Sequence, residues 1–136
     1  MRKGFTLLEL IVVIVILGIM STLAATQYTK MVEKSRGAEA RIMLGSIRTN
    51  EAALRLQNGA CSSTAADVGI STDFPSTCTS THYFSYGLAG ASGNTFTATA
   101  SRCTEDGKSP QGSTGSITLT TNFDNGSDVW TVTAPY

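Results

Sequence analysis

Hydrophobic and polar residues divide the chain into three stretches. Residues 5–25 are almost wholly apolar and contain one ionisable side chain, Glu9. Residues 26–59 contain no proline and mix charged residues with good helix formers. An apolar stripe recurs there at helical spacing, formed by Ala40, Met43, Leu44, Ile47 and Leu54. Asn58-Gly59 is typical of a helix end, because glycine readily adopts the left-handed conformation. The pattern predicts one helix from Phe5 to Asn58, with its stripe packed on the chain's own C-terminal part.

The periodicity changes after Gly59. Residues 60–80 are rich in Ser and Thr and contain the breaker Phe74-Pro75, which is typical of a loop. Four stretches rich in β-formers follow, at residues 83–88, 95–102, 116–123 and 129–133. Turn residues at 90–93 and 124–128 separate them into two hairpins. We therefore expect an α+β fold, with a long N-terminal helix packed on a small antiparallel sheet of about four strands within residues 81–136.

The N-terminal apolar stretch is long enough to cross a membrane. Twenty-one helical residues span roughly 31 Å, close to the ~30 Å hydrocarbon core. The short positive leader before it should stay in the cytoplasm. A cleaved signal peptide would end in a small-residue site, which Ala24-Ala25-Thr26 imitates only in part. A carboxylate such as Glu9 costs ~2.5–3.5 kcal/mol inside a membrane helix, so it needs a partner.

Gly4-Phe5-Thr6-Leu7-Leu8-Glu9, followed by an apolar run containing Gly18, resembles the prepilin processing motif of bacterial type IV pilins and pseudopilins. The resemblance implies cleavage between Gly4 and Phe5 and N-methylation of Phe5. It also implies that Glu9 neutralises the terminal amine of a neighbouring subunit during assembly. Thr26 stands where many pilins have proline, so we expect a straighter helix here.

The resemblance also implies an organisation of the chain. Residues 1–4 would form a prepilin leader and residues 5–25 a transmembrane helix that becomes the filament core. Residues 26–59 would form an amphipathic continuation of that helix, residues 60–80 a connecting loop and residues 81–136 the sheet region.

The function implied is that of a structural subunit of an extracellular, type IV pilus-like filament. The chain would be a helical homo-oligomer, serving adhesion, motility or DNA uptake. Its partners would be the inner membrane before assembly, a prepilin peptidase and the pilus assembly machinery. One alternative is a pseudopilin of a type II secretion system, which would stay in the periplasm. A further alternative is a single-pass, membrane-anchored binding domain, which needs no processing.

Charge is distributed unevenly although the formal net charge is zero, which excludes a strongly basic nucleic-acid binder. Residues 26–59 are net positive and residues 60–136 net negative. Lys34, Arg41, Arg48 and Arg55 recur every seven residues, and Glu51 is spaced to pair with Arg48 or Arg55. This basic stripe is a solvated face, a contact with the acidic part of neighbouring subunits, or a narrow DNA footprint. We expect no specific nucleic-acid partner.

Candidate chemistry is sparse: the chain has one histidine and no catalytic constellation, so we expect no enzyme and no cofactor. Cys78 and Cys103 flank the first predicted hairpin, which favours a disulfide between them. Cys61–Cys78 is the alternative, and one thiol is left over. Asp124, Asn125 and Asp128 offer oxygen ligands for calcium, as in some pseudopilins. A plain hairpin turn explains the same residues, and we expect no metal.

Overall fold

The computed structural model describes residues 4–104, 108, 114–133 and 136. It contains a helix α1 (Leu7–Asn58), a short 3-10 helix η1 (Ala65–Val68) and four strands. The expected α+β architecture is confirmed. The chain divides into two compact units, residues 1–32 and 33–136, which are described separately.

Helix α1 ends where the sequence predicts. Gly59 has φ +78° and donates its amide hydrogen to the Arg55 carbonyl oxygen at 2.8 Å, which satisfies one of the last free carbonyls of the helix. At the other end, α1 begins at Leu7 rather than at the predicted Phe5. The reason lies in Thr6, which caps the helix instead of joining it.

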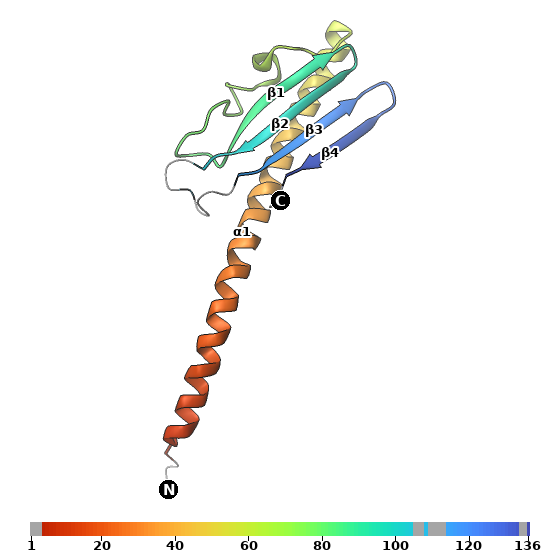
Figure 1. Cartoon of the computed structure of the whole chain (residues 1–136). Coiled ribbons are helices and arrows are strands. Elements are labelled where there is room, and N and C mark those ends of the chain that lie inside the picture. Colours follow the sequence, from red (N-terminus) through yellow and green to blue (C-terminus); the bar gives the residue numbers. More distant parts are fainter. Residues whose placement is uncertain (1–3, 105–107, 109–113, 134–135) are drawn as a thin grey trace. The chain divides into compact units, whose positions relative to one another are not determined.

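The strands form one antiparallel sheet in the order β1-β2-β3-β4 (Figure 1). Their bounds are β1 Phe84–Ser92, β2 Thr95–Arg102, β3 Ser116–Asn122 and β4 Ser127–Val132. Strand β1 extends further than predicted, because a bulge between Leu88 and Gly90 absorbs the glycine-rich stretch. The hairpin turn therefore lies at Gly93-Asn94, where Gly93 has φ +56°.

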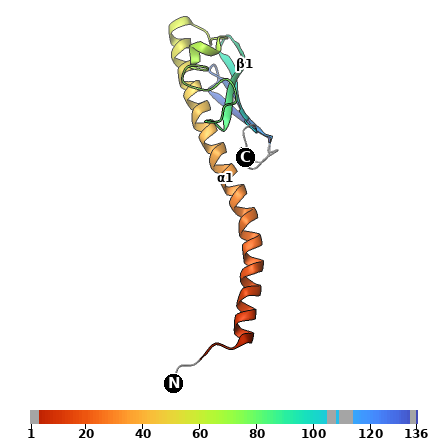
Figure 2. The same ribbon diagram turned by 90° about the vertical axis from the view of Figure 1, so that its left-hand side faces the viewer.

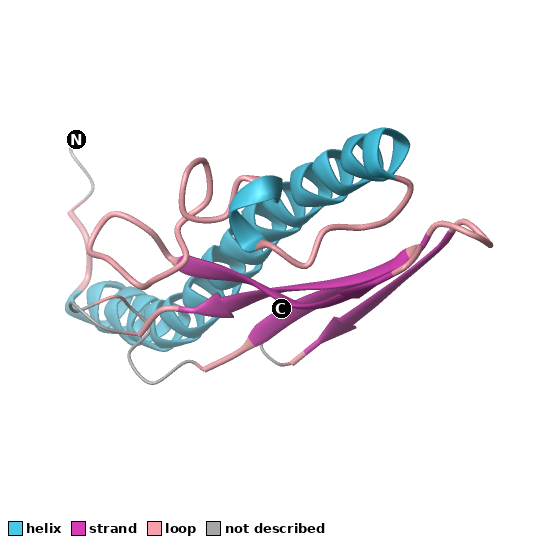
Figure 3. Ribbon diagram, turned by 90° about the horizontal axis from the view of Figure 1, so that it is seen from above, coloured by secondary structure: helices cyan, strands magenta, loops and turns pink. Residues whose placement is uncertain are grey.

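Within residues 33–136, α1 runs along one face of the sheet (Figures 2 and 3). The core between them contains Leu44, Ile47, Phe96, Ile117 and Leu119, all fully buried. Strands β2 and β3 alternate buried with half-buried residues, as expected for a sheet with one face on the core. Of the predicted helical stripe, Ala40, Leu44 and Ile47 are buried, and Met43 and Leu54 pack at the edge.

The buried face of α1 also contains residues that its hydrophobic pattern does not reveal: Glu33, Gly37 and Glu51. The prediction that Glu51 pairs with Arg48 or Arg55 is wrong. Its Oε2 atom instead accepts the amide hydrogen of Ser62 at 3.0 Å, because the side chain points inward.

A disulfide joins Cys78 to Cys103, the pairing that the first hairpin favours. Cys103 follows the last residue of β2, and its amide donates to the Tyr83 carbonyl oxygen at 2.9 Å. Cys78 lies in the connecting segment before β1. The bridge therefore ties that segment to the end of β2, outside the ladder, where the alternation of strand faces imposes no constraint. Cys61 is free and half-buried.

Candidate assembly site

The first half of α1 presents apolar side chains on all sides of the helix. Every large hydrophobic side chain from Leu7 to Leu23 is 47–75% exposed within the described chain. By length and composition this helix could cross a membrane, with a mean hydropathy of 2.7 in its most apolar window. A helix that is apolar all round is stable only when other apolar groups surround it, either lipid or further helices.

The few hydroxyl groups of this half are satisfied by the helix itself. Ser21 donates to the Leu17 carbonyl oxygen at 2.8 Å, and Thr26 donates to that of Leu23 at 3.0 Å. These bonds remove the cost of placing a free hydroxyl in an apolar environment. Thr26, which stands at the expected proline position, lies within the continuous α1.

Glu9 is bound to Thr6 in an arrangement that the sequence analysis missed. Its Oε2 atom accepts hydrogen bonds from the Thr6 amide at 2.9 Å and from the Thr6 hydroxyl at 2.8 Å. In return, the Thr6 Oγ1 atom accepts the Glu9 amide hydrogen at 3.2 Å. This is a capping box, and the spacing Thr-x-x-Glu before an apolar run is its signature. Glu9 therefore has a structural role in the isolated chain, alongside any role in assembly.

Gly4, Phe5 and Thr6 precede the helix. The Phe5 side chain is 86% exposed, and a Cβ atom at Gly4 would meet nothing within 4 Å. The Gly4–Phe5 peptide bond therefore lies in non-helical, exposed chain, as a protease substrate requires. The rest of the predicted leader, residues 1–3, lies outside the described residues.

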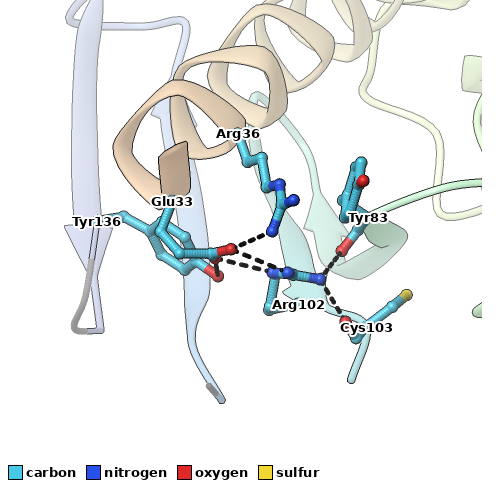
Figure 4. A network of polar contacts seen from close by, with 6 residues as sticks. All are labelled: Glu33, Arg36, Tyr83, Arg102, Cys103 and Tyr136. Atoms are coloured by element: carbon cyan, nitrogen blue, oxygen red, sulfur yellow. Dashed lines mark hydrogen bonds and ion pairs between the residues drawn. The ribbon is translucent and has the colours of Figure 1, made fainter. Parts of the chain in front are cut away.

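A buried ionic network fastens the second half of α1 to the end of β2 (Figure 4). Glu33 is 2% exposed and accepts two hydrogen bonds from Arg102, from Nε to Oε2 and from Nη2 to Oε1, each 3.0 Å long. Arg36 and Tyr136 donate to the same carboxylate. Arg102 also donates to the carbonyl oxygens of Tyr83 and Cys103. The network thus joins the helix to the open end of the first hairpin, where β1 begins and β2 ends, and to the disulfide residue Cys103.

The electrostatics of this network favour the charged state of the pair. Burial raises the pKa of Glu33, but the hydrogen bonds and charges of Arg102 and Arg36 outweigh it and hold the pKa below its usual value. Burial, followed by the charge of Glu33, raises the pKa of Tyr136 to about 12. The Tyr136 ring lies on Gly37, where an added Cβ would approach it to 2.7 Å, so the helix needs glycine there.

Comparisons with known proteins identify a family motif in the N-terminal segment and relatives that share about half of the chain. Residues 1–25 match the prokaryotic N-terminal methylation motif. The chain is 36% identical over 67 residues to the type IV major fimbrial protein FimA of Dichelobacter nodosus, covering 49% of this chain and 41% of that protein. It is 37% identical over 70 residues to a fimbrial protein of Moraxella nonliquefaciens, covering 48% and 45%. No solved structure matches it significantly. The chain carries a prepilin methylation motif and is a distant homologue of the type IV fimbrial proteins, or pilins.

This pilin homologue spans less than half the length of the curated relatives that it matches. Pilins are structural and not enzymatic proteins, in agreement with the expectation from the sequence. Similarity is shared with them over about half of this chain.

The basic stripe of the pilin homologue is used in two ways. Arg48 and Arg55 form ion pairs with Asp128 and Asp124 of the same chain, at 2.8 and 3.9 Å. Lys34 and Arg41 are exposed and have no ion pair within the described residues. The acidic sheet region is therefore partly neutralised by its own helix.

Of the candidate calcium ligands, Asp124 and Asn125 lie in the turn between β3 and β4, and Asp128 lies in β4, which begins two residues earlier than predicted. Each of the three accepts hydrogen bonds from other groups of the chain. Asp128 accepts hydrogen bonds from Arg48 and Thr121, and Asp124 accepts one from Asn94. Asn125 accepts the amide hydrogen of Ser127. In the described part of the chain, no three His, Cys, Asp or Glu side chains gather closely enough to hold a metal ion. These contacts are those of a hairpin turn docked on α1.

Proposed function

We propose that this protein is a structural subunit of a type IV pilus-like filament, assembled through the first half of α1. The observation that carries the proposal is the exposed apolar surface of residues 7–23, which lies within the stretch that matches the N-terminal methylation motif. Lipid covers that surface before assembly, and the same helices of other subunits cover it in the filament. The subunit is then an inner-membrane protein first and an extracellular one afterwards.

Processing precedes assembly in this proposal. Cleavage of the exposed Gly4–Phe5 bond by a prepilin peptidase releases a terminal amine on Phe5, which is then methylated. Cleavage leaves Thr6 and Glu9 in place, so the cap of α1 survives it. In the assembled filament, Glu9 faces the Phe5 amine of a neighbour, and this pair offsets the cost of a carboxylate in an apolar bundle and sets the axial register.

Relatives that are fimbrial proteins favour a pilus over the pseudopilus of a type II secretion system. The engagement of Asp124 and Asp128 by arginines and neutral side chains of the same chain gives no support to the calcium site of some pseudopilins. A single-pass anchored binding domain needs no processing, so this alternative does not explain the methylation motif.

Substitution of Glu9 tests the assembly step, and the capping box decides which substitution is informative. Glu9→Leu removes both the charge and the cap, so a loss of filaments would be ambiguous. Glu9→Gln keeps a side chain that serves in capping boxes but removes the charge that the neighbour's amine needs. We expect processed, membrane-resident Glu9→Gln protein with few or no filaments, counted as sheared filaments per membrane subunit.

Thr6→Val is the matched control, because it weakens the cap and leaves the charge of Glu9. It should keep most of the filament yield. Normal filament yield from Glu9→Gln would contradict pairing between Glu9 and the neighbour's amine.

A further inference from the structure

A hollow of about 200 Å³ opens between the second half of α1, the connecting segment and the start of β1. Its inner wall consists of the buried rings of Phe74, Phe84 and Tyr86, and its rim carries the exposed carboxylates Glu39 and Asp73. For comparison, a cavity of about 150 Å³ holds benzene. The hollow therefore has room for one side chain and is too small for a nucleotide.

Three polar groups of this hollow, on Tyr86, Glu39 and Asp73, have no polar partner among the residues that the structure describes. Tyr86 is 6% exposed, and its hydroxyl group makes no hydrogen bond to any described residue. Burial, followed by the charge of Glu39, raises its pKa to about 12, so the phenol stays neutral. Glu39 and Asp73 likewise have no ion pair in the described part of the chain. Two carboxylates, a neutral hydroxyl and aromatic walls suit an organic cation on an aliphatic stem.

Among the described lysines and arginines, none fills this role, and His82 lies in the wall of the hollow without an ion pair to a described carboxylate. Arg36 precedes Glu39 by three residues on α1, but it donates to Glu33, and its guanidinium carbon lies 3.9 Å from the centre of the Tyr83 ring. Lys108 donates to the Thr79 carbonyl oxygen. The charges of Glu39 and Asp73 are thus left for a cation from outside.

A complementary surface lies on the other flank of the helix. Lys34 and Arg41, with Gly37, Ala38 and Tyr136, line a shallow groove. At 3.6 residues per turn, both basic residues lie roughly 140–160° around the helix from Glu39. The buried face of α1 separates the two flanks, so one chain cannot bring its own Lys34 or Arg41 into its own hollow.

We propose that Lys34 or Arg41 of one copy inserts into the hollow beside Glu39 and Asp73 of a second copy. This inference rests on the proposed filament function and names a contact that sets the register between subunits. The two surfaces differ and lie on opposite flanks, so the contact is heterologous. A heterologous contact that does not close into a ring adds subunits without limit and builds a filament.

Charge reversal tests the contact in the full-length protein. Lys34→Glu with Arg41→Glu, or Glu39→Lys with Asp73→Lys, should lower sheared filaments per membrane subunit by about tenfold or more, because like charges then meet. Combining all four substitutions reverses both surfaces and should restore filaments. Lys30→Glu is the matched control, since it reverses an exposed positive charge outside both surfaces. It should leave the yield unchanged.

A zero-length carbodiimide cross-link on wild-type filaments identifies the partners directly. We expect dimers whose peptides join Lys34 to Glu39 or Asp73, and Arg41→Lys should add a second cross-link to the same carboxylates. Wild-type filament yield from both reversed pairs, or cross-links of Lys34 exclusively to other carboxylates, would overturn this inference and leave the proposed function intact. Absence of filaments from the wild-type protein would contradict both.

Discussion

At the scale of single residues, Glu33 links helix α1 to the end of strand β2 through a buried ion pair. Its carboxylate holds the buried guanidinium of Arg102, whose own bonds reach Tyr83 and the disulfide residue Cys103. A buried pair of this kind contributes little compared with an apolar pair of equal volume, but removing one partner leaves the other charged and unpaired. Removing Glu33 alone should therefore lower the free energy of unfolding by more than the complete ion pair adds relative to an apolar pair.

We expect Glu33→Gln to destabilise the fold by about 3–5 kcal/mol, because Arg102 stays buried without its counter-charge. Denaturant unfolding of the full chain in detergent, followed by the fluorescence of the single tryptophan, Trp130 on β4, measures this. The pKa of Glu33 is lowered in the folded protein, so its contribution is present above the unfolded pKa and is lost as pH falls through the folded one. The deficit of Glu33→Gln should therefore shrink towards acidic pH. A loss below about 1 kcal/mol would contradict this role.

The ionised form of Glu51, unlike that of Glu33, destabilises the folded protein. It is fully buried, and its Oε1 atom has no hydrogen-bond partner among the described residues. Burial raises its pKa, the Ser62 amide opposes this, and the charge of Asp67 adds to it. Because the folded state holds the proton more tightly than the unfolded state, stability falls as pH rises from the unfolded pKa to the folded one.

Glu51→Gln should remove that pH dependence. Relative to the wild-type protein, the variant should gain roughly 1 kcal/mol between pH 4 and pH 7, because an unpaired buried charge is no longer formed. Parallel unfolding curves at the two pH values give the difference directly. An equal difference in the free energy of unfolding between the two proteins at pH 4 and at pH 7 would show that ionisation of Glu51 does not destabilise the fold.

At the scale of elements, the disulfide stabilises the connecting segment against the end of β2. Its two cysteines are 25 residues apart in sequence, which predicts a contribution of about 2–4 kcal/mol from restriction of the unfolded chain. Changing both Cys78 and Cys103 to Ser should cost that amount in tryptophan-monitored unfolding. Cys61→Ser is the matched control, and should change stability by less than about 0.5 kcal/mol. Equal losses from the two changes would contradict the pairing.

The sequence predicts the elements well where local chemistry decides them. The stop at Gly59, strand β2 and the helical stripe around Leu44 follow from propensity and periodicity. The start of α1 is displaced because Thr6 and Glu9 form a cap, a signal present in the sequence as Thr-x-x-Glu. The first hairpin turn is displaced because a bulge in β1 tolerates Gly90. Local pattern does not locate a bulge, since pairing with β2 determines it.

The burial of Glu33 and Glu51 could not be predicted from the sequence. Glu33 and Glu51 fall on the buried face of α1 by their spacing, yet a charged residue is ordinarily assigned to solvent. Their burial depends on Arg102 and Ser62, which are distant in sequence and become neighbours only in the folded chain. The hollow beside Tyr86 is likewise assembled from three separate segments and has no local signature.

At the scale of the whole molecule, we assign a separate task to each of the two units, residues 1–32 and residues 33–136. Residues 1–32 supply an apolar helix that requires lipid or other helices around it. Residues 33–136 have their own core, disulfide and ionic network, with two surfaces of opposite charge on the flanks of α1. An anchored monomer would use the first unit only for attachment. In a filament, the same apolar helix would, after processing, pack against the helices of other subunits and form the core of the assembly.

The intact mass of the subunit in sheared surface filaments tests whether the processed apolar helix becomes part of a filament. We expect a chain that begins at Phe5, carries one added methyl group and retains the Cys78–Cys103 disulfide. Gly4→Val should abolish this species and leave a longer, membrane-retained precursor, because a branched side chain crowds the scissile bond. A surface protein that still begins at Met1, or one cut beyond Ala25 and so without its apolar helix, would rule out assembly of a processed subunit through this helix.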